Sequence, residues 1–409
     1  MYKYLIFLLL ICLTSKIYSQ NEWGGTPYGY VKADVFLDTR QVVNVRDGHV
    51  LLYPAPRLEA NGEDANEGLN FNILAIQSRF GFRIKAPDFL GAKASGVIEG
   101  EFFGSTNTDI GSVRLRLANV KLDWGKHEVV AGHDWHPLFI AEALAQTISF
   151  NTGIPFVAFA RNPLVTYTYK TDNFKAMLSG VTEMEFPSTG PQGPSTSYLR
   201  NAGFPMLNLG LRYSIDKFYF AANANYKELK PRLISDQGFK DHNVTSGFTA
   251  NFLMRYKTDD FYITASVLQG QNTFDLLMLG GYAVKSIDPT TGVWEYSAMN
   301  TRSAWLDMQY GKDLTFGVFG GFETNLGAND EIVGNYYARG ITQNKDAGTD
   351  IDYIYRLSPR IAYKLGKTQI ATELEYSAAA YGKRDNKGKV SDSQEVRNLR
   401  ILVAAFIFF

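Results

Sequence analysis

Arginine and acidic residues recur at alternate positions in several segments of the chain, and this spacing places them on one face of a β-strand. Opposite charges on facing strands form cross-strand ion pairs. Arginine side chains along a water-filled wall could equally guide anions, since the guanidinium fork pairs with carboxylates. Both interpretations stay open at this stage. The residues concerned are Asp34, Asp38, Arg79, Arg83, Glu99, Glu101, Arg114, Arg116, Arg356, Arg360, Lys364, Glu373, Glu375 and Arg400.

A catalytic or metal-binding alternative starts from the sequence HDWH, in which His133, Asp134 and His136 supply ligand types that suit zinc. On a strand, however, the two histidines point to opposite faces, so we favour histidines at a pore mouth. No GxSxG phrase occurs, and Glu99 and Glu101 beside arginines should stay ionised. We therefore predict no enzyme, no metal and no cofactor. An outer-membrane hydrolase or a surface-binding barrel remains the alternative.

The first residues indicate export. Residues 1–19 combine Lys3 with a short apolar run and end at Ser19, which predicts a cleaved signal peptide and a barrel domain over 20–409. The lone cysteine, Cys12, falls within this signal. The chain has 41 basic and 41 acidic side chains, a balance that argues against a nucleic-acid partner. After the signal no apolar run is long enough for a transmembrane helix.

Strand patterns fill the remainder. The phrase RYKTDDFYI at 255–263 has counterparts at 168–176 and 212–220, each an aromatic residue, a short polar turn and a resumed apolar alternation. Short turns of this kind alternate with long loops. The first strands are predicted at 28–43 and 69–85, with an exposed polar loop at 44–68. We predict an all-β, transmembrane antiparallel β-barrel of about 16 strands, with short periplasmic turns and long extracellular loops.

The orientation of the strands follows from two observations. Aromatic residues end the apolar faces at the turns, as an interfacial girdle requires. A barrel of about 16 strands is also too wide for side chains to fill, so its charged face meets water. The predicted girdle residues are Trp124, Tyr169, Tyr213, Tyr256, Tyr310 and Tyr363.

The segment 135–162 is unusually apolar for an exposed loop, which favours burial against another part of the protein. We interpret it as a constriction loop that folds into the pore, with Asp134, His136 and Arg161 as its polar residues and a short helix at 140–146. A loop that contacts a neighbouring protomer is the alternative.

A family resemblance is carried by the segments QSRFGFRIKAP, GVIEGEFFG, VRLRLANVKLDWG, VVAGHDW and ARNPLVTYTYK, which lie within 76–170. These resemble the DcaP-like trimeric outer-membrane porins. The resemblance implies a trimer of sixteen-stranded barrels that passes small, mostly anionic solutes, with pore arginines at Arg79, Arg83, Arg114 and Arg116. Residues 20–28 are too short for the helical extension that some members carry, so barrel walls would have to hold the trimer.

Taken together, the sequence predicts a passive porin in the outer membrane of a Gram-negative bacterium. Its solutes would be small, hydrophilic and anionic, such as small carboxylates. Selectivity would arise from the arginines of the pore and from the constriction loop. The expected partners are outer-membrane lipid, lipopolysaccharide, the solutes and further copies of the chain in a homotrimer.

Overall fold

The computed structural model describes residues 23–150 and 152–409, and it folds as a closed antiparallel barrel of 16 strands, as predicted. The predicted signal peptide lies outside the described residues. Closure is direct, because β1 (Gly24–Arg40) pairs with the final strand, β23 (Val390–Phe408), from Tyr30 opposite Phe408 to Asp38 opposite Arg400. No helix in the described ranges is long and apolar enough to cross a membrane.

The second wall strand is divided into two. It comprises β6 (Glu67–Leu74) and β7 (Arg79–Lys85), both paired with β1, whereas the sequence predicted one continuous strand at 69–85. Between them the chain turns, and Ile76 and Gln77 are buried. The outward apolar residues shift from odd positions in β6, such as Phe71, to even positions in β7, such as Phe82, and this change of phase was the available signal for the interruption.

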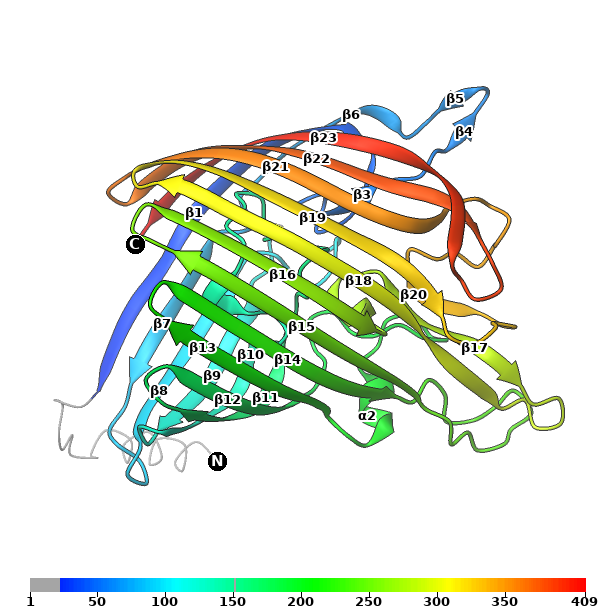
Figure 1. Cartoon of the computed structure of the whole chain (residues 1–409), viewed down its shortest axis with the longest axis horizontal. Coiled ribbons are helices and arrows are strands. Elements are labelled where there is room, and N and C mark those ends of the chain that lie inside the picture. The colour runs from blue at the N-terminus through cyan, green and yellow to red at the C-terminus, as the bar shows by residue number, and fades with distance from the viewer. Residues whose placement is uncertain (1–22, 151) are drawn as a thin grey trace, which may run out of the picture.

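The remaining wall strands follow in chain order, joined by short turns at one end of the barrel and by long loops at the other (Figure 1). They are β8 (Lys93–Glu101), β9 (Arg114–Asp123), β10 (His127–Trp135), β11 (Arg161–Lys170), β12 (Phe174–Val181), β13 (Met206–Ile215), β14 (Phe218–Leu229), β15 (Thr245–Lys257), β16 (Phe261–Gln271), β18 (Trp294–Gly311), β19 (Leu314–Ala328), β21 (Asp350–Leu365) and β22 (Thr368–Arg384).

Smaller elements lie in the long loops. Two hairpins follow β1: an inner hairpin formed by β2 (Val42–Val45) and β3 (Val50–Pro54), and an outer hairpin formed by β4 (Glu59–Ala60) and β5 (Glu63–Asp64). In Figure 1 the outer hairpin projects away from the barrel. The others are η1 (Ala141–Ala143), α2 (Ser197–Ala202), η2 (Phe274–Leu276), β17 (Gly280–Ile287) and β20 (Tyr336–Arg339).

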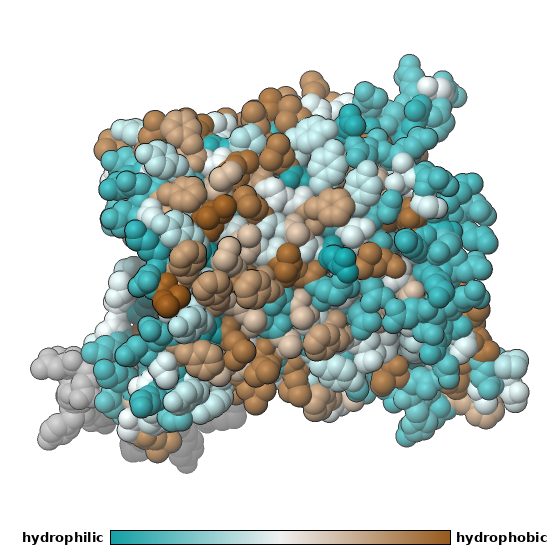
Figure 2. All heavy atoms as spheres, in the orientation of Figure 1, coloured by the Kyte–Doolittle hydropathy of each residue, from teal (hydrophilic) through white to brown (hydrophobic). Residues whose placement is uncertain are grey.

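The outside of the barrel is apolar. Along β15, for example, Phe248, Phe252 and Met254 are between 40 and 53% exposed, whereas Asn251 and Leu253, which alternate with them, are buried. Figure 2 shows apolar residues over the strands and polar residues at the ends that carry turns and loops. Five of the six predicted girdle residues are exposed on this outer face, with Tyr310 at 63%, and Tyr256 is half-buried. An apolar belt between polar ends is the surface that a bilayer requires.

Candidate functional site

The charged face of the strands points into the barrel, and its charges form ion pairs between neighbouring strands. Arg400 binds Asp38 across the β23–β1 seam at 2.7 Å. Arg116 binds Glu99 and Glu101, each at 2.6 Å. The side chains of these residues are 6% exposed or less. The ion pairs therefore offset the hydration that the charged groups lose on burial.

The same pairing continues on the other side of the seam, where Arg356 of β21 binds Glu373 at 2.6 Å and Glu375 at 3.1 Å on β22. The ion-pair interpretation therefore describes most of the predicted arginines. Substituting Arg114 and Arg116 together would leave Glu101 buried without its closest partners, so their loss would disturb the wall as well as the pore field.

One of these pairs crosses an entire strand. Arg360 on β21 reaches Asp307 on β18 at 2.7 Å, although β19 lies between them. The guanidinium passes over Gly317 of β19, where an added Cβ would lie 2.6 Å from its central carbon. Sequence reasoning missed Asp307 because it considered neighbouring strands only. A glycine at an inward position of β19 was the available signal.

The side chains of Arg79 and Arg83 are more accessible to solvent than those of the fully paired arginines. Arg79 is 21% exposed at its side chain and lies 3.6 Å from Glu99 and 3.8 Å from Glu101, farther than Arg116 does. Arg83 is exposed, with its guanidinium 3.9 Å above the ring of Tyr28. These two residues contribute more to the field in the lumen than the fully paired arginines do.

The segment between β10 and β11, which we call the inward loop (136–150 and 152–160), crosses the interior of the barrel. Side chains of several wall strands bind its main chain: Asn251 of β15 donates to the Leu138 carbonyl at 2.9 Å, and Asp307 of β18 accepts from the Gln146 amide at 2.9 Å. Among the described residues, the wall side chains that bind its backbone include Lys32, Arg212, Asn251, Arg255, Ser303, Asp307 and Glu373.

The three polar residues predicted for this loop separate in the structure. Asp134 belongs to β10 and accepts from the Asn119 side chain at 2.8 Å, while Arg161 begins β11 and binds Glu185. Only His136 lies in the loop proper, where burial lowers its pKa to about 4 and keeps it neutral at pH 7. The predicted helix at 140–146 is one short turn, η1.

The histidine cluster does not form a metal site in this arrangement. The Nδ1 atom of His136 accepts the Leu138 amide at 3.2 Å, and His133 points toward Glu185 and the arginines beside it. Within the described part of the chain, His, Cys, Asp and Glu residues form no group of three or more that could hold a metal ion.

Two cavities flank the inward loop. One, of about 280 Å³, lies between the loop and the charged wall, and its lining includes Lys32, Arg79 and Arg116. Among the described residues of that lining there is no carboxylate. Aromatic rings surround these cations, namely Tyr30, Trp135, Phe139, Phe150, Phe159 and Phe406.

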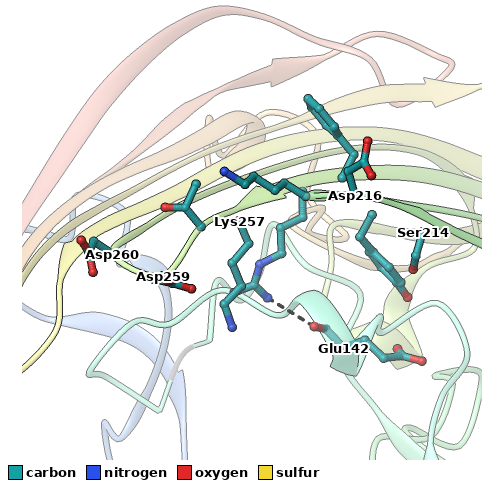
Figure 3. Close-up of a pocket in the computed structure, with 11 residues that line it drawn as sticks. Glu142, Ser214, Asp216, Lys257, Asp259 and Asp260 are labelled. Atoms are coloured by element: carbon teal, nitrogen blue, oxygen red, sulfur yellow. Dashed lines mark hydrogen bonds between the residues drawn. The ribbon is translucent and has the colours of Figure 1, made fainter.

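The other cavity, of about 670 Å³, opens at the end with the short turns (Figure 3). Glu142 of the inward loop faces it from one side, and Asp216, Lys257 and Asp259 line it from the barrel. Arg255 joins the two sides, because it donates to the Glu142 carbonyl at 3.2 Å. The cavity carries both signs of charge.

Comparisons with known proteins support this architecture. The crystal structure of the outer membrane channel DcaP of Acinetobacter baumannii matches with a TM-score of 0.69 and 16% identity, over 96% of this chain and 99% of that one. An anion-selective porin from Comamonas acidovorans matches with a TM-score of 0.56 and 13% identity, over 95% and 100% of the two chains. OmpT of Vibrio cholerae, expressed in the outer membrane, matches with a TM-score of 0.56 and 11% identity, over 96% and 100%.

The resemblance to the DcaP channel that the sequence motifs predicted is thus confirmed, as a likeness of fold. No protein-family model matches the chain. No curated protein matches it either.

Proposed function

We propose that the protein is a channel of the bacterial outer membrane that passes small, hydrophilic anions by diffusion and catalyses no reaction. The closed barrel with an apolar exterior supports the location, and the likeness to structures described as outer-membrane channels and porins supports the activity. Lipid and lipopolysaccharide would surround the barrel, and three copies would associate through their walls.

The cavity beside the charged wall carries the anion preference. A carboxylate that enters it meets Lys32, Arg79 and Arg116. Glu99, Glu101 and Asp34 bind the same cations and neutralise part of this charge, but none of the three lines the cavity. A solute therefore encounters donors first, and donors at a narrow passage favour anions.

The inward loop serves as the constriction in this proposal. Its ends belong to adjacent strands, and its middle is bound to the opposite wall at Asp307 and Glu373. A loop that spans the lumen in this way divides it into narrower passages. Its main chain, which the walls hold, would form the rim of the passage.

The substitution Arg79→Gln tests the anion preference. Glu99 and Glu101 keep Arg116 as their closer partner, so the wall should remain folded while one cation leaves the cavity. We expect the reversal potential in a salt gradient across a planar bilayer to shift toward lower anion selectivity, with similar conductance. The matched control is Arg57→Gln, whose side chain is 62% exposed in the segment that precedes the outer hairpin. An unchanged reversal potential in Arg79→Gln would contradict the assignment.

A further inference from the structure

The inner hairpin, β2 and β3, folds back into the barrel. Residues 44–68 were predicted as an exposed polar loop, and this prediction is wrong for the part that forms the hairpin. Val50, Leu51 and Leu52 are at most 3% exposed. Val50 and Leu52 belong to one apolar cluster with Phe150 and Phe159 of the inward loop. The alternation of apolar residues around an Arg-Asp-Gly turn was the signal for a hairpin.

A third segment also enters the lumen. Leu277, Met278 and Leu279, which follow η2, are at most 1% exposed, and the Leu279 amide donates to Glu323 of β19 at 2.8 Å. Leu277 and Leu279 join the same cluster as the inner hairpin and the inward loop. Three loops from the long-loop end therefore meet inside the barrel.

This filling is confined to one half of the lumen. Toward the long loops, inward residues of the wall such as Asp38, Thr301 and Glu323 are at most 1% exposed. Toward the short turns, inward residues such as Arg83, Lys257 and Lys364 are exposed to solvent. The structure combines an open periplasmic half with an extracellular half packed by apolar side chains.

The inner hairpin is held differently from the inward loop. Its polar attachments to the barrel include His49 to Asp34 of β1 at 3.0 Å and Tyr381 of β22 to the Pro54 carbonyl at 2.6 Å. Its main chain is bound as well, at the Asp47 carbonyl by Asn72 of β6 at 3.0 Å and at the Arg46 amide by Asn107 at 2.6 Å, and its apolar side chains pack in the cluster. Pro54 and Pro56 restrict the backbone where the hairpin returns to the rim.

We propose that the inner hairpin is a gate, closed in this structure, that leaves the lumen as one piece while the inward loop stays in place. The proposal rests on the channel function proposed above. Solute entry from outside requires the apolar cluster to separate, and the inner hairpin can leave the cluster while wall residues such as Asp307 still bind the inward loop. Its closed position is stabilised by burial, so opening is an equilibrium between packed and exposed states.

Replacing residues 42–54 with Gly-Gly tests the gate. The ends of this segment are neighbours, because the Ala55 amide donates to the Gln41 carbonyl at 2.9 Å, so the replacement does not stretch the chain. The matched control replaces 59–64, the outer hairpin, whose ends are joined likewise by the Ala65 amide and the Leu58 carbonyl at 2.8 Å. We expect a several-fold larger single-channel conductance without the inner hairpin and no change without the outer one.

A tethered variant covers the case in which the shortened protein does not fold. The rings of His49 and Phe103 lie 4.9 Å apart, so a short thiol-specific cross-linker can join the two positions in His49→Cys/Phe103→Cys. The only native cysteine is Cys12. We expect cross-linking to suppress conductance and reduction of the linker to restore it.

The outcomes separate the gate from the channel. Equal conductance of the natural protein and the variant without 42–54, or full conductance of the cross-linked protein, would overturn the gate and leave the channel intact. Silence of every folded variant, with or without the inner hairpin, would instead overturn the channel function on which the gate depends.

Discussion

The inward loop and the inner hairpin both enter the lumen, yet the barrel holds them by different means. The inward loop is bound through its own backbone, for example at the Leu138 carbonyl by Asn251 and at the Ile148 amide by Glu373. The inner hairpin is bound at its turn, by His49 on Asp34 and by Asn72 on the Asp47 carbonyl, and at its end, by Tyr381 on the Pro54 carbonyl. Between these attachments it packs against the cluster through apolar side chains.

This difference indicates which segment can move. Releasing the inward loop would break its hydrogen bonds to buried wall carboxylates such as Asp307 and Glu373, which keep their arginine partners, and each lost bond costs about 0.5–1.5 kcal/mol. Releasing the inner hairpin separates His49 from Asp34 and exposes apolar area, and the free energy of that exposure is roughly proportional to the area. Both neutral wall residues such as Asn251 and charged ones such as Asp307 hold the inward loop.

The largest expected effect follows from removing a wall residue that serves both an ion pair and the inward loop. In Glu373→Ala, Arg356 loses its closer carboxylate and the Ile148 and Ser149 amides lose their acceptor. We expect a loss of about 3–5 kcal/mol in the free energy of unfolding, as for a broken buried pair. Urea unfolding followed by tryptophan fluorescence would measure it.

Glu395→Ala is the control for that substitution, because Glu395 pairs with an Arg397 that is 62% exposed. Exposed pairs contribute about 0–1 kcal/mol, so the control should unfold almost as the natural protein does. Similar losses in the two variants would contradict the view that the wall fixes the inward loop.

A smaller effect is expected for Asn251→Ala. The substitution removes the donor to the Leu138 carbonyl and leaves that oxygen buried without its partner, at a cost of about 1–3 kcal/mol. Single-channel records should show noisier open levels, because one attachment of the constriction is lost. Asn70→Ala, which removes an exposed side-chain contact to Gln41, should leave the free energy of unfolding and the noise of the open level unchanged.

The smallest effect is expected at the inner hairpin. Tyr381→Phe removes the hydrogen bond to the Pro54 carbonyl and keeps the ring, a change of about 0.5–1.5 kcal/mol. More frequent openings, at unchanged open conductance, should appear in single-channel records. The matched control is Tyr353→Phe, because the Tyr353 hydroxyl donates to Glu395 on the outer surface of the barrel. A change in open conductance would show that the tyrosine acts on the constriction instead.

The barrel itself could be predicted because strand alternation is local. Residues such as Phe80 and Arg79 reveal their faces from spacing alone, and regular turns reveal the strand ends. The sequence also predicted that acidic residues pair with basic residues on neighbouring strands, because acidic and basic strands alternate around the seam. Partners that skip a strand, such as Arg360 and Asp307, require the actual register and the gap at Gly317.

The interior could not be predicted in the same way. Whether a long loop lies outside or folds inward depends on contacts between segments far apart in sequence, such as Leu52 with Phe159. The apolar composition of the inward loop indicated burial correctly, whereas the acidic stretch after the inner hairpin made the whole of 44–68 look exposed. The average composition of that loop therefore did not distinguish the inner hairpin, which is buried, from the outer hairpin, which is largely exposed.

One measurement tests the central claim most directly: conductance and reversal potential in a planar bilayer under a salt gradient, for the natural protein and the variant without residues 42–54. The account predicts stepwise conductance with an anion-biased reversal potential in both, and larger steps in the variant. Absence of conductance from both folded proteins would contradict the channel, and a cation-biased potential would contradict the role of Lys32, Arg79 and Arg116.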